Sequence, residues 1–268
     1  MGENQIPSLD RATLWRVAAR SLFLEASWNL IGQQNLGFAA AVNPALKVLY
    51  KAGSEEFVAA QRRVLSFFNT NPVLSGLVIG AALKLEEERA KGLISERDSS
   101  LIVSTLASTL AIHGDLLFWQ AWLPFSCLMG FGLTWLSLAQ GQITFWPLII
   151  PALFGALAWP TRIGGIFYGY RLGATAHRAV AKLKAPLIAR VVLRLTVFLT
   201  GFLTVYSVKL IGPKTDGRIW PIFVIAALAP LLALAQKRWP KIGYAGLYLL
   251  IVFGLTLAAV ALYERSLF

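Results

Sequence analysis

The sequence is poor in cysteine and in charged side chains, and both shortages narrow what the chain can be. Cys127 is the only cysteine, so no disulfide can form within the chain and a disulfide-braced secreted module is excluded. Charged residues make up 14% of the chain, against roughly a quarter in average globular proteins, and 57% of the residues are hydrophobic. This composition also excludes a disordered chain.

Acidic residues are especially scarce in the second half. Residues 1–115 hold eleven bases and eleven acids, whereas residues 116–268 hold fourteen bases and two acids, Asp216 and Glu264. The net charge of +12 therefore belongs to the apolar half. A nucleic-acid surface would interleave its bases with polar residues, but these bases lie between long uncharged runs, as in loops between membrane spans. We expect no nucleic-acid partner.

The uncharged runs are long enough to cross a membrane. Residues 116–161 contain no charged side chain, and a spanning helix needs about 20 apolar residues. Within lipid, backbone groups must be satisfied internally, which in this sequence predicts helices. The predicted fold class is an all-α, polytopic helical membrane protein. Its expected spans are 116–138 and 143–160, separated by a break at 139–142, followed by 195–208, 219–236 and 242–263.

The basic residues predict the orientation. The connection 162–194 carries seven bases and no acid, which places it in the cytoplasm. Counting spans from there puts the N-terminus in the cytoplasm, the 209–218 loop and the C-terminus outside, and the 237–241 turn inside. The bases of the 209–218 loop weigh against this order. The first twenty residues show no signal peptide.

The N-terminal region 1–98 is expected to be helical, and to be cytoplasmic or to lie at the membrane interface. Ser8 is a candidate cap for a helix from Leu9, while Ser54 and Ser95 precede acidic first turns typical of helix starts.

One apolar segment of this region, 64–83, is broken at 69–72 by Asn69, Thr70 and Asn71 with a following proline. These residues favour a turn that leads into a helix from about Val73. The charged end of that helix, 84–89, fits either a solvated helix end or a polar cap facing a substrate path.

Glycines spaced four apart predict close helix packing. Gly76 and Gly80 form one such pair, and Gly165, Gly169 and Gly173 repeat the spacing twice. A helix face of small residues lets a second backbone approach. We therefore expect a tightly packed helix within the basic connection.

Asp115 is the most unusual ionisable residue of the expected membrane region 99–161. It follows His113 and Gly114 and precedes the uncharged run. Such a group faces a cavity or a partner, or else marks a hydrated membrane boundary. His113 lies on another helix face and His177 lies among basic residues, so neither predicts a metal site, and no cofactor or catalytic residue is expected.

Several motifs together resemble the IID membrane subunit of the mannose/fructose/sorbose family of the bacterial phosphotransferase system (PTS). The order and spacing of these motifs continue over nearly the whole chain, and the Phe-Phe-Asn-Thr-x-Pro segment followed by Leu-Glu-Glu is the most specific part. The motifs are Arg20-Ser21, Ala26-Ser27-Trp28-Asn29, Gln34-Asn35-Leu36-Gly37-Phe38, Pro44-Ala45-Leu46, Leu49-Tyr50, Phe67-Phe68-Asn69-Thr70-Asn71-Pro72, Leu85-Glu86-Glu87-Glu88-Arg89-Ala90, Gly114-Asp115-Leu116-Leu117-Phe118-Trp119 and Tyr168-Gly169-Tyr170.

The resemblance implies a non-enzymatic half of a sugar permease, located in the bacterial inner membrane. It implies that a IIC membrane subunit pairs with the chain to translocate a hexose, that cytoplasmic IIA and IIB subunits carry the phosphoryl group to the sugar, and that IIC/IID pairs assemble into a higher oligomer. The basic connection would then contact membrane lipid or dock a phosphorylated partner, and lipid contact is the commoner use of such charge.

The chain also departs from the family pattern before Asp115. Glycines and a proline are usual there, whereas residues 103–113 are rich in Ser, Thr, Leu and Ala and predict an uninterrupted helix. A second hypothesis is therefore a divergent, non-transporting membrane scaffold or regulatory subunit. An intramembrane enzyme is a distant third, because no second acid, His or Cys accompanies Asp115 at a useful spacing.

Aromatic residues such as Trp28, Trp119 and Tyr170 favour packing at an interface over stacking on a sugar. The candidate residues form two groups. The candidates for the substrate path or a subunit interface are Asp115, Gly114, Asn69, Thr70, Asn71, Glu86, Glu87, Trp28 and Asn29, and those for helix packing are Gly76, Gly80, Gly165, Gly169 and Gly173.

Overall fold

The computed structural model describes residues 7–138, 140–142 and 145–211, and over these ranges it is helical and contains no strand. This confirms the all-α prediction for the described part. The chain divides into two compact units, Met1–Thr200 and Gly201–Phe268, and only residues 201–211 of the second are described. The α-helices are α1 (Arg11–Ser21), α2 (Asn35–Leu49), α3 (Glu55–Val64), α4 (Ser75–Ala90), α5 (Glu96–Gly114), α6 (Leu123–Leu138), α7 (Ile149–Leu172), α8 (Ala176–Lys182) and α9 (Ala185–Ile211).

Capping residues in the sequence predicted the starts of α3 and α5 correctly, but not the start of α1. Ser54 caps α3 and Ser95 caps α5, each by accepting a hydrogen bond from the backbone amide three residues on. The prediction that Ser8 caps the first helix was wrong. Asp10 holds that position, because its carboxylate accepts the backbone N–H of Thr13 at 2.8 Å.

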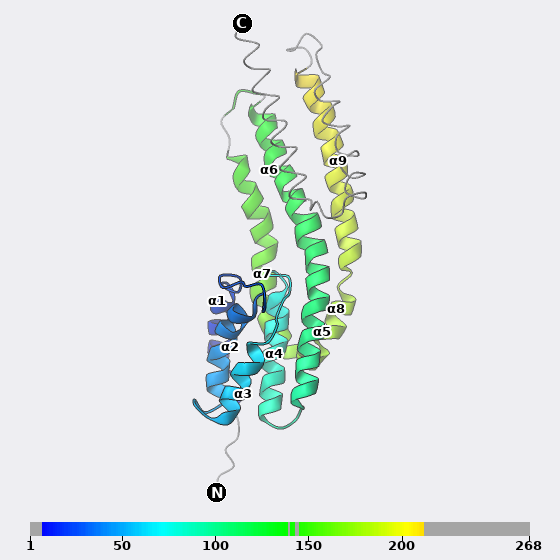
Figure 1. Cartoon of the computed structure of the whole chain (residues 1–268). Helices are drawn as coiled ribbons and strands as arrows, with labels where there is room; N and C mark the ends of the chain where they lie inside the picture. Colours follow the sequence, from blue (N-terminus) through cyan, green and yellow to red (C-terminus); the bar gives the residue numbers. More distant parts are fainter. Residues whose placement is uncertain (1–6, 139, 143–144, 212–268) are drawn as a thin grey trace. The chain divides into compact units, whose positions relative to one another are not determined.

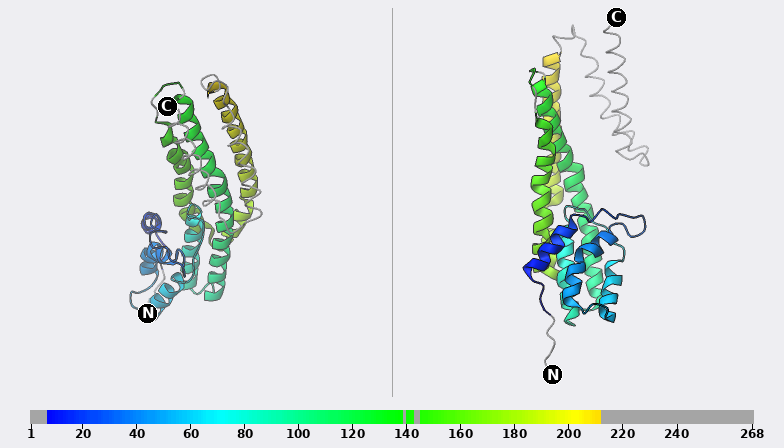
Figure 2. Two further views of the ribbon diagram at one scale, coloured as in Figure 1. Left: turned by 45° about the horizontal axis from the view of Figure 1, so that its top comes forward. Right: turned by 90° about the vertical axis from the view of Figure 1, so that its left-hand side faces the viewer.

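Within the first unit, α4 and α1 contact the C-terminal half of α7, α2 packs on α1 and α4, and α3 packs on α2 (Figures 1 and 2). α4 contacts α7 along its length, α1 packs on α2, and the ring of Trp15 lies edge-on against Phe167 with centroids 4.9 Å apart. Burial of apolar surface drives this association. The largest fully buried apolar side chains of this core include Leu24, Leu46, Ile79, Leu83, Leu110, Phe118 and Ile166.

One continuous helix runs from Glu96 to Leu138, because α5 passes through a π-helical segment, Asp115–Trp122, into α6. The helix before Asp115 is uninterrupted, as predicted, and the chain leaves it at Leu138, beside the predicted break. At 1.5 Å per residue these 43 residues extend roughly 65 Å, about twice the thickness of the hydrocarbon core. Part of this helix must therefore lie outside the lipid hydrocarbon.

The predicted span 143–160 and the connection from residue 162 require correction. After a short 3₁₀ turn, α7 begins at Ile149 and passes through Pro160 and Arg162 without a break, to end at Leu172. The next residue, Gly173, has a φ of 50°, which a side chain disfavours. Residues 162–172 are thus the end of a helix packed on α4, and only the rest of the predicted connection forms turns, the short helix α8 and the start of α9.

The helix α9 covers the predicted span 195–208. α9 begins at Ala185, ten residues before the predicted span 195–208. The predicted spans 219–236 and 242–263 lie outside the described residues. Among the described residues, three stretches are long and apolar enough to cross a membrane, namely Glu96–Leu138, Trp146–Lys182 and Ala185–Tyr206.

Candidate functional site

The turn before α4 meets the end of α5 at Asp115. The side-chain amide of Asn71 donates a hydrogen bond to Oδ1 of Asp115 at 2.9 Å, and its own Oδ1 accepts the backbone N–H of Val73 at 3.0 Å. Gly114 makes room for this contact, since a Cβ there would clash with the side chain of Asn71. Asn71 is buried and Asp115 is exposed, so the carboxylate lies at the edge of the bundle.

Gln34 fixes the same turn from the other side. Its side-chain amide pairs with the backbone of Thr70, accepting the N–H at 3.0 Å and donating to the carbonyl oxygen at 2.9 Å. Gln34 is buried, and the Thr70 hydroxyl has no partner among the described residues. The neighbouring Asn69 is exposed. Sequence reasoning did not single out Gln34, because its pairing with Thr70 is a long-range contact.

Trp28 and Asn29 lie in the loop between α1 and α2. Asn29 organises this loop, because its Oδ1 accepts the N–H of Gly32 at 2.7 Å and its Nδ2 donates to Asn35 at 2.9 Å. The Asn35 amide in turn donates to the carbonyl oxygen of Leu65 at 2.7 Å. Trp28 is half exposed. The structure gives Asn29 a local folding role and leaves the indole of Trp28 free to contact lipid or a partner.

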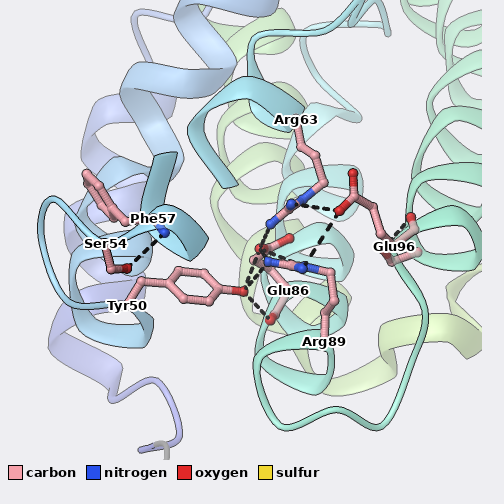
Figure 3. A network of polar contacts seen from close by, with 8 residues as sticks. Tyr50, Ser54, Phe57, Arg63, Glu86, Arg89 and Glu96 are labelled. Carbon is pink, nitrogen blue, oxygen red and sulfur yellow. Dashed lines mark hydrogen bonds and ion pairs between the residues drawn. The ribbon is translucent and has the colours of Figure 1, made fainter. Parts of the chain in front are cut away.

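Glu86 is the centre of a charge network between α3, α4 and α5 (Figure 3). Its carboxylate accepts hydrogen bonds from Arg63 and Tyr50 at 2.7 Å each and from Arg89 at 3.1 Å. Arg63 also pairs with Glu96 at 3.0 Å. Burial by itself raises the pKa of Glu86, but hydrogen bonds from Arg63 and Tyr50 outweigh it, so the pKa lies below its ordinary value.

Glu87 points to a different side of α4 and is fully buried. It accepts hydrogen bonds from Lys91 at 2.6 Å and from Lys84 at 3.2 Å, and the Tyr170 hydroxyl of α7 also donates to it. Ser8 and the N–H of Leu9 reach it from the segment before α1, at 3.1 and 3.3 Å. Burial opposes ionisation, but the hydrogen bonds, that of Lys91 first among them, lower the pKa of Glu87 to about 2.

The surroundings of Glu86 and Glu87 contradict the interpretation of residues 84–89 as a solvated helix end. A solvated helix end would leave Glu86 and Glu87 in water, whereas both carboxylates are enclosed by partners from other elements. Successive residues on a helix are about 100° apart, so the two side chains reach different neighbours. Glu86 ties α4 to α3 and to Tyr50 at the end of α2, and Glu87 ties α4 to α7 and to the segment before α1. Arg63 and Tyr50 were not among the predicted site residues.

The glycine faces of α4 and α7 lie directly against each other. A Cβ on Gly76 would clash with the carbonyl oxygen of Arg162, one on Gly80 with that of Ile166, and one on Gly169 with that of Leu77. A Cβ on Gly165 would lie 2.9 Å from the backbone nitrogen of Leu77. Gly173 faces the Lys84 side chain. We call the four glycines at 76, 80, 165 and 169 the glycine seam.

The described residues hold no group of three or more His, Cys, Asp or Glu side chains that could bind a metal ion. His113 and His177 line one cleft between α5 and α8, and each ring contacts a carbonyl oxygen of its own helix or turn through Nδ1. A separate groove of about 400 Å³ opens between α2, α3, α4 and α5, and Asn69 and Glu86 line it. Asp115 is not among the residues that line this groove.

Comparison with known sequences matches residues 8–216 to the family described as the PTS system mannose/fructose/sorbose family IID component. The mannose-specific EIID component of Escherichia coli is 34% identical over 166 residues, which cover 62% of this chain and 57% of that relative. The fructose permease IID component of Bacillus subtilis is 32% identical over 167 residues, 62% of this chain and 58% of the relative. The aligned part spans somewhat more than half the length of these curated relatives.

Two solved structures share the fold. One, described as a membrane protein, superposes with a TM-score of 0.74 at 26% identity and covers 97% of this chain and 98% of that one. The other, the mannose transporter ManYZ in complex with a microcin, superposes with a TM-score of 0.58 at 24% identity, covering 96% of this chain and 97% of that one. The chain is therefore a helical membrane protein.

Proposed function

This chain belongs to the mannose/fructose/sorbose family of PTS IID components, and we propose that it is a membrane subunit of a sugar permease. In this proposal it pairs with a IIC subunit to translocate a hexose, which IIB phosphorylates on the cytoplasmic side. The observation that carries the proposal is the family match over residues 8–216. Helices long enough to cross a membrane support it.

We assign phosphoryl transfer to the partner subunits and no catalytic residue to this chain. Both histidines contact backbone carbonyl oxygens through Nδ1 and lie beside lysine or apolar side chains. In this proposal IIA and IIB carry the phosphoryl group, and IIC/IID pairs form the larger assembly.

We propose that the N-terminus and the basic segment 171–194 face the cytoplasm of the bacterial inner membrane. One end of the first unit holds α8, the end of α7 and the charged end of α4 (Figure 1). A single orientation of the chain therefore places the basic residues of all three on the same side of the membrane. The C-terminus is then outside. A reporter fused after Thr175 should be active in its cytoplasmic form, and one fused at Phe268 in its external form. Activity of both on the same side would overturn this topology.

A non-transporting scaffold is the second candidate. It is favoured by the uninterrupted helix α5, which offers no broken backbone before Asp115 to line a polar site. The two candidates differ in one observable. A scaffold co-purifies with IIC but supports no sugar uptake, whereas a permease subunit supports uptake.

Asp115→Asn should lower mannose uptake, by up to about tenfold, in cells that express the chain with its IIC, IIB and IIA partners and no other hexose permease. A carboxylate accepts the Asn71 amide roughly 1–1.5 kcal/mol more strongly than a neutral amide does, so a transport-competent conformation that holds this contact should become less populated by up to about tenfold. Uptake of radiolabelled mannose over the first minute is the measurement.

Glu88→Gln is the matched control for this experiment, since it removes one negative charge without touching the Asn71–Asp115 contact. It should retain full uptake. Full uptake by Asp115→Asn would remove Asp115 from any essential role. Uptake that is absent already in the unmodified chain, together with stable co-purification with IIC, would support the scaffold.

A further inference from the structure

The groove between α2, α3, α4 and α5 has a size and lining that suit one small ligand. Its volume of about 400 Å³ lies in the usual range of ligand pockets. Phe38 and Phe68, stacked with ring centroids 4.1 Å apart, belong to its apolar wall, and Phe67 is exposed at its rim. Its opposite wall is α5. Small-ligand sites commonly combine apolar walls with a few convergent polar groups.

The α5 wall presents a row of hydroxyl groups. Ser100, Ser104 and Ser108 are spaced four apart and therefore share one face of the helix. The hydroxyls of Ser104 and Ser108 donate to helix carbonyl oxygens, which leaves their oxygens free to accept from a ligand. The exposed Asn69 amide lies at the same groove and can both donate and accept.

The charged end of the groove is electrically balanced. Arg63 and Arg89 face Glu86 and Glu96, so two positive charges meet two negative ones (Figure 3). An anionic ligand would find no surplus positive charge there. The buried Nε–H of Arg63 nevertheless has no acceptor among the described residues. The lining therefore favours a neutral ligand rich in hydroxyl groups over a phosphorylated one.

We propose that this groove binds a neutral, hexose-sized sugar through the hydroxyl row of α5 and Asn69. The proposal takes its substrate class from the permease function above. It adds a sugar-contacting site within this subunit itself, on the side of α5 that faces α4. In this proposal the serines of α5 before Asp115 bind the sugar.

The test is equilibrium dialysis of the full chain in lipid nanodiscs, free of glycoside detergents, against radiolabelled mannose and mannose 6-phosphate. We expect saturable, millimolar binding of mannose and at least tenfold weaker binding of the phosphate ester. The double variant Ser104→Ala/Ser108→Ala should bind mannose about tenfold more weakly, because two hydrogen bonds of typical net strength are lost. Asn69→Ala should weaken binding severalfold.

Thr109→Val is the matched control, because Thr109 lies on the same helix but lines the α5–α8 cleft. It should bind mannose like the unmodified chain. No saturable binding, equal loss in the control and the double variant, or equal affinity for the phosphate ester would each overturn the proposal. Equal thermal midpoints of all variants show that a loss of binding is not a loss of folding.

Uptake by the complete complex separates this proposal from the permease proposal. Uptake by a chain that binds no mannose in nanodiscs would overturn the groove site and leave the permease function standing. Binding by a chain whose complex takes up no sugar would support the groove site and contradict the permease function.

Discussion

Gly169→Ala should destabilise the folded chain by about 3 kcal/mol, even though alanine is the better helix former. A Cβ at Gly169 would clash with the carbonyl oxygen of Leu77 and lie 2.9 Å from the backbone nitrogen of Ala81. Both atoms belong to the backbone of α4, which cannot rotate aside as a side chain can. A loss of this size should lower the thermal midpoint of the purified chain by roughly 6–12 °C, measured by size-exclusion chromatography after heating.

Gly164→Ala on the same helix is the control, and its effect should have the opposite sign. A Cβ at Gly164 meets nothing in the described part of the chain, and this glycine is exposed. Alanine there restricts the unfolded chain and favours the helix, so the midpoint should stay unchanged or rise. If both variants melt together, the glycine seam does not determine the stability of the α4–α7 pair.

The glycine seam also shows which part of the fold the sequence could predict. Spacing alone indicated that Gly165 and Gly169 share a helix face, because helical periodicity is a local property. The partner of that face could not be read locally, because α4 and α7 are far apart in the chain. The bases after Thr161 resembled the end of a membrane span, yet packing on α4 keeps the helix going to Leu172.

In the candidate site, too, the local contacts could be predicted from the sequence and the long-range contacts could not. Ser54, Ser95 and the turn at 69–72 were predictable, since each depends on hydrogen bonds to residues two or three positions away. The partners of Glu86 and Glu87 were not, because they come from elements that only the fold brings near α4. A charge run therefore indicated a polar helix end but did not show that two of its carboxylates are enclosed.

Glu87→Ala is expected to cost about 3–5 kcal/mol, because it removes the shared acceptor of a buried network and leaves its partners uncompensated. Lys84, Lys91 and Tyr170 converge on this carboxylate, as does the segment before α1. Glu88→Ala is the matched control: Glu88 is the next residue of α4, no ion pair involves it among the described residues, and its effect should stay within about 0.5 kcal/mol.

Loss of the Glu87 network should also release α1. Limited trypsin digestion should then cleave after Arg11 and Arg16 faster in Glu87→Ala than in Glu88→Ala, because α1 is held partly through Glu87. Equal cleavage rates together with equal thermal midpoints would contradict a structural role for this carboxylate.

The pH dependence of stability gives an independent test of the same group. The pKa of Glu87 lies at about 2 in the folded chain, against an ordinary value of 4.5. A lowered pKa means that ionisation stabilises the fold fully above pH 4.5, and that this stabilisation is lost as the pH falls from 4.5 towards 2. The thermal midpoint of the unmodified chain should therefore decline over that range more steeply than that of Glu87→Gln, which cannot titrate there. Parallel profiles would mean that the buried carboxylate does not set the acid stability of the bundle.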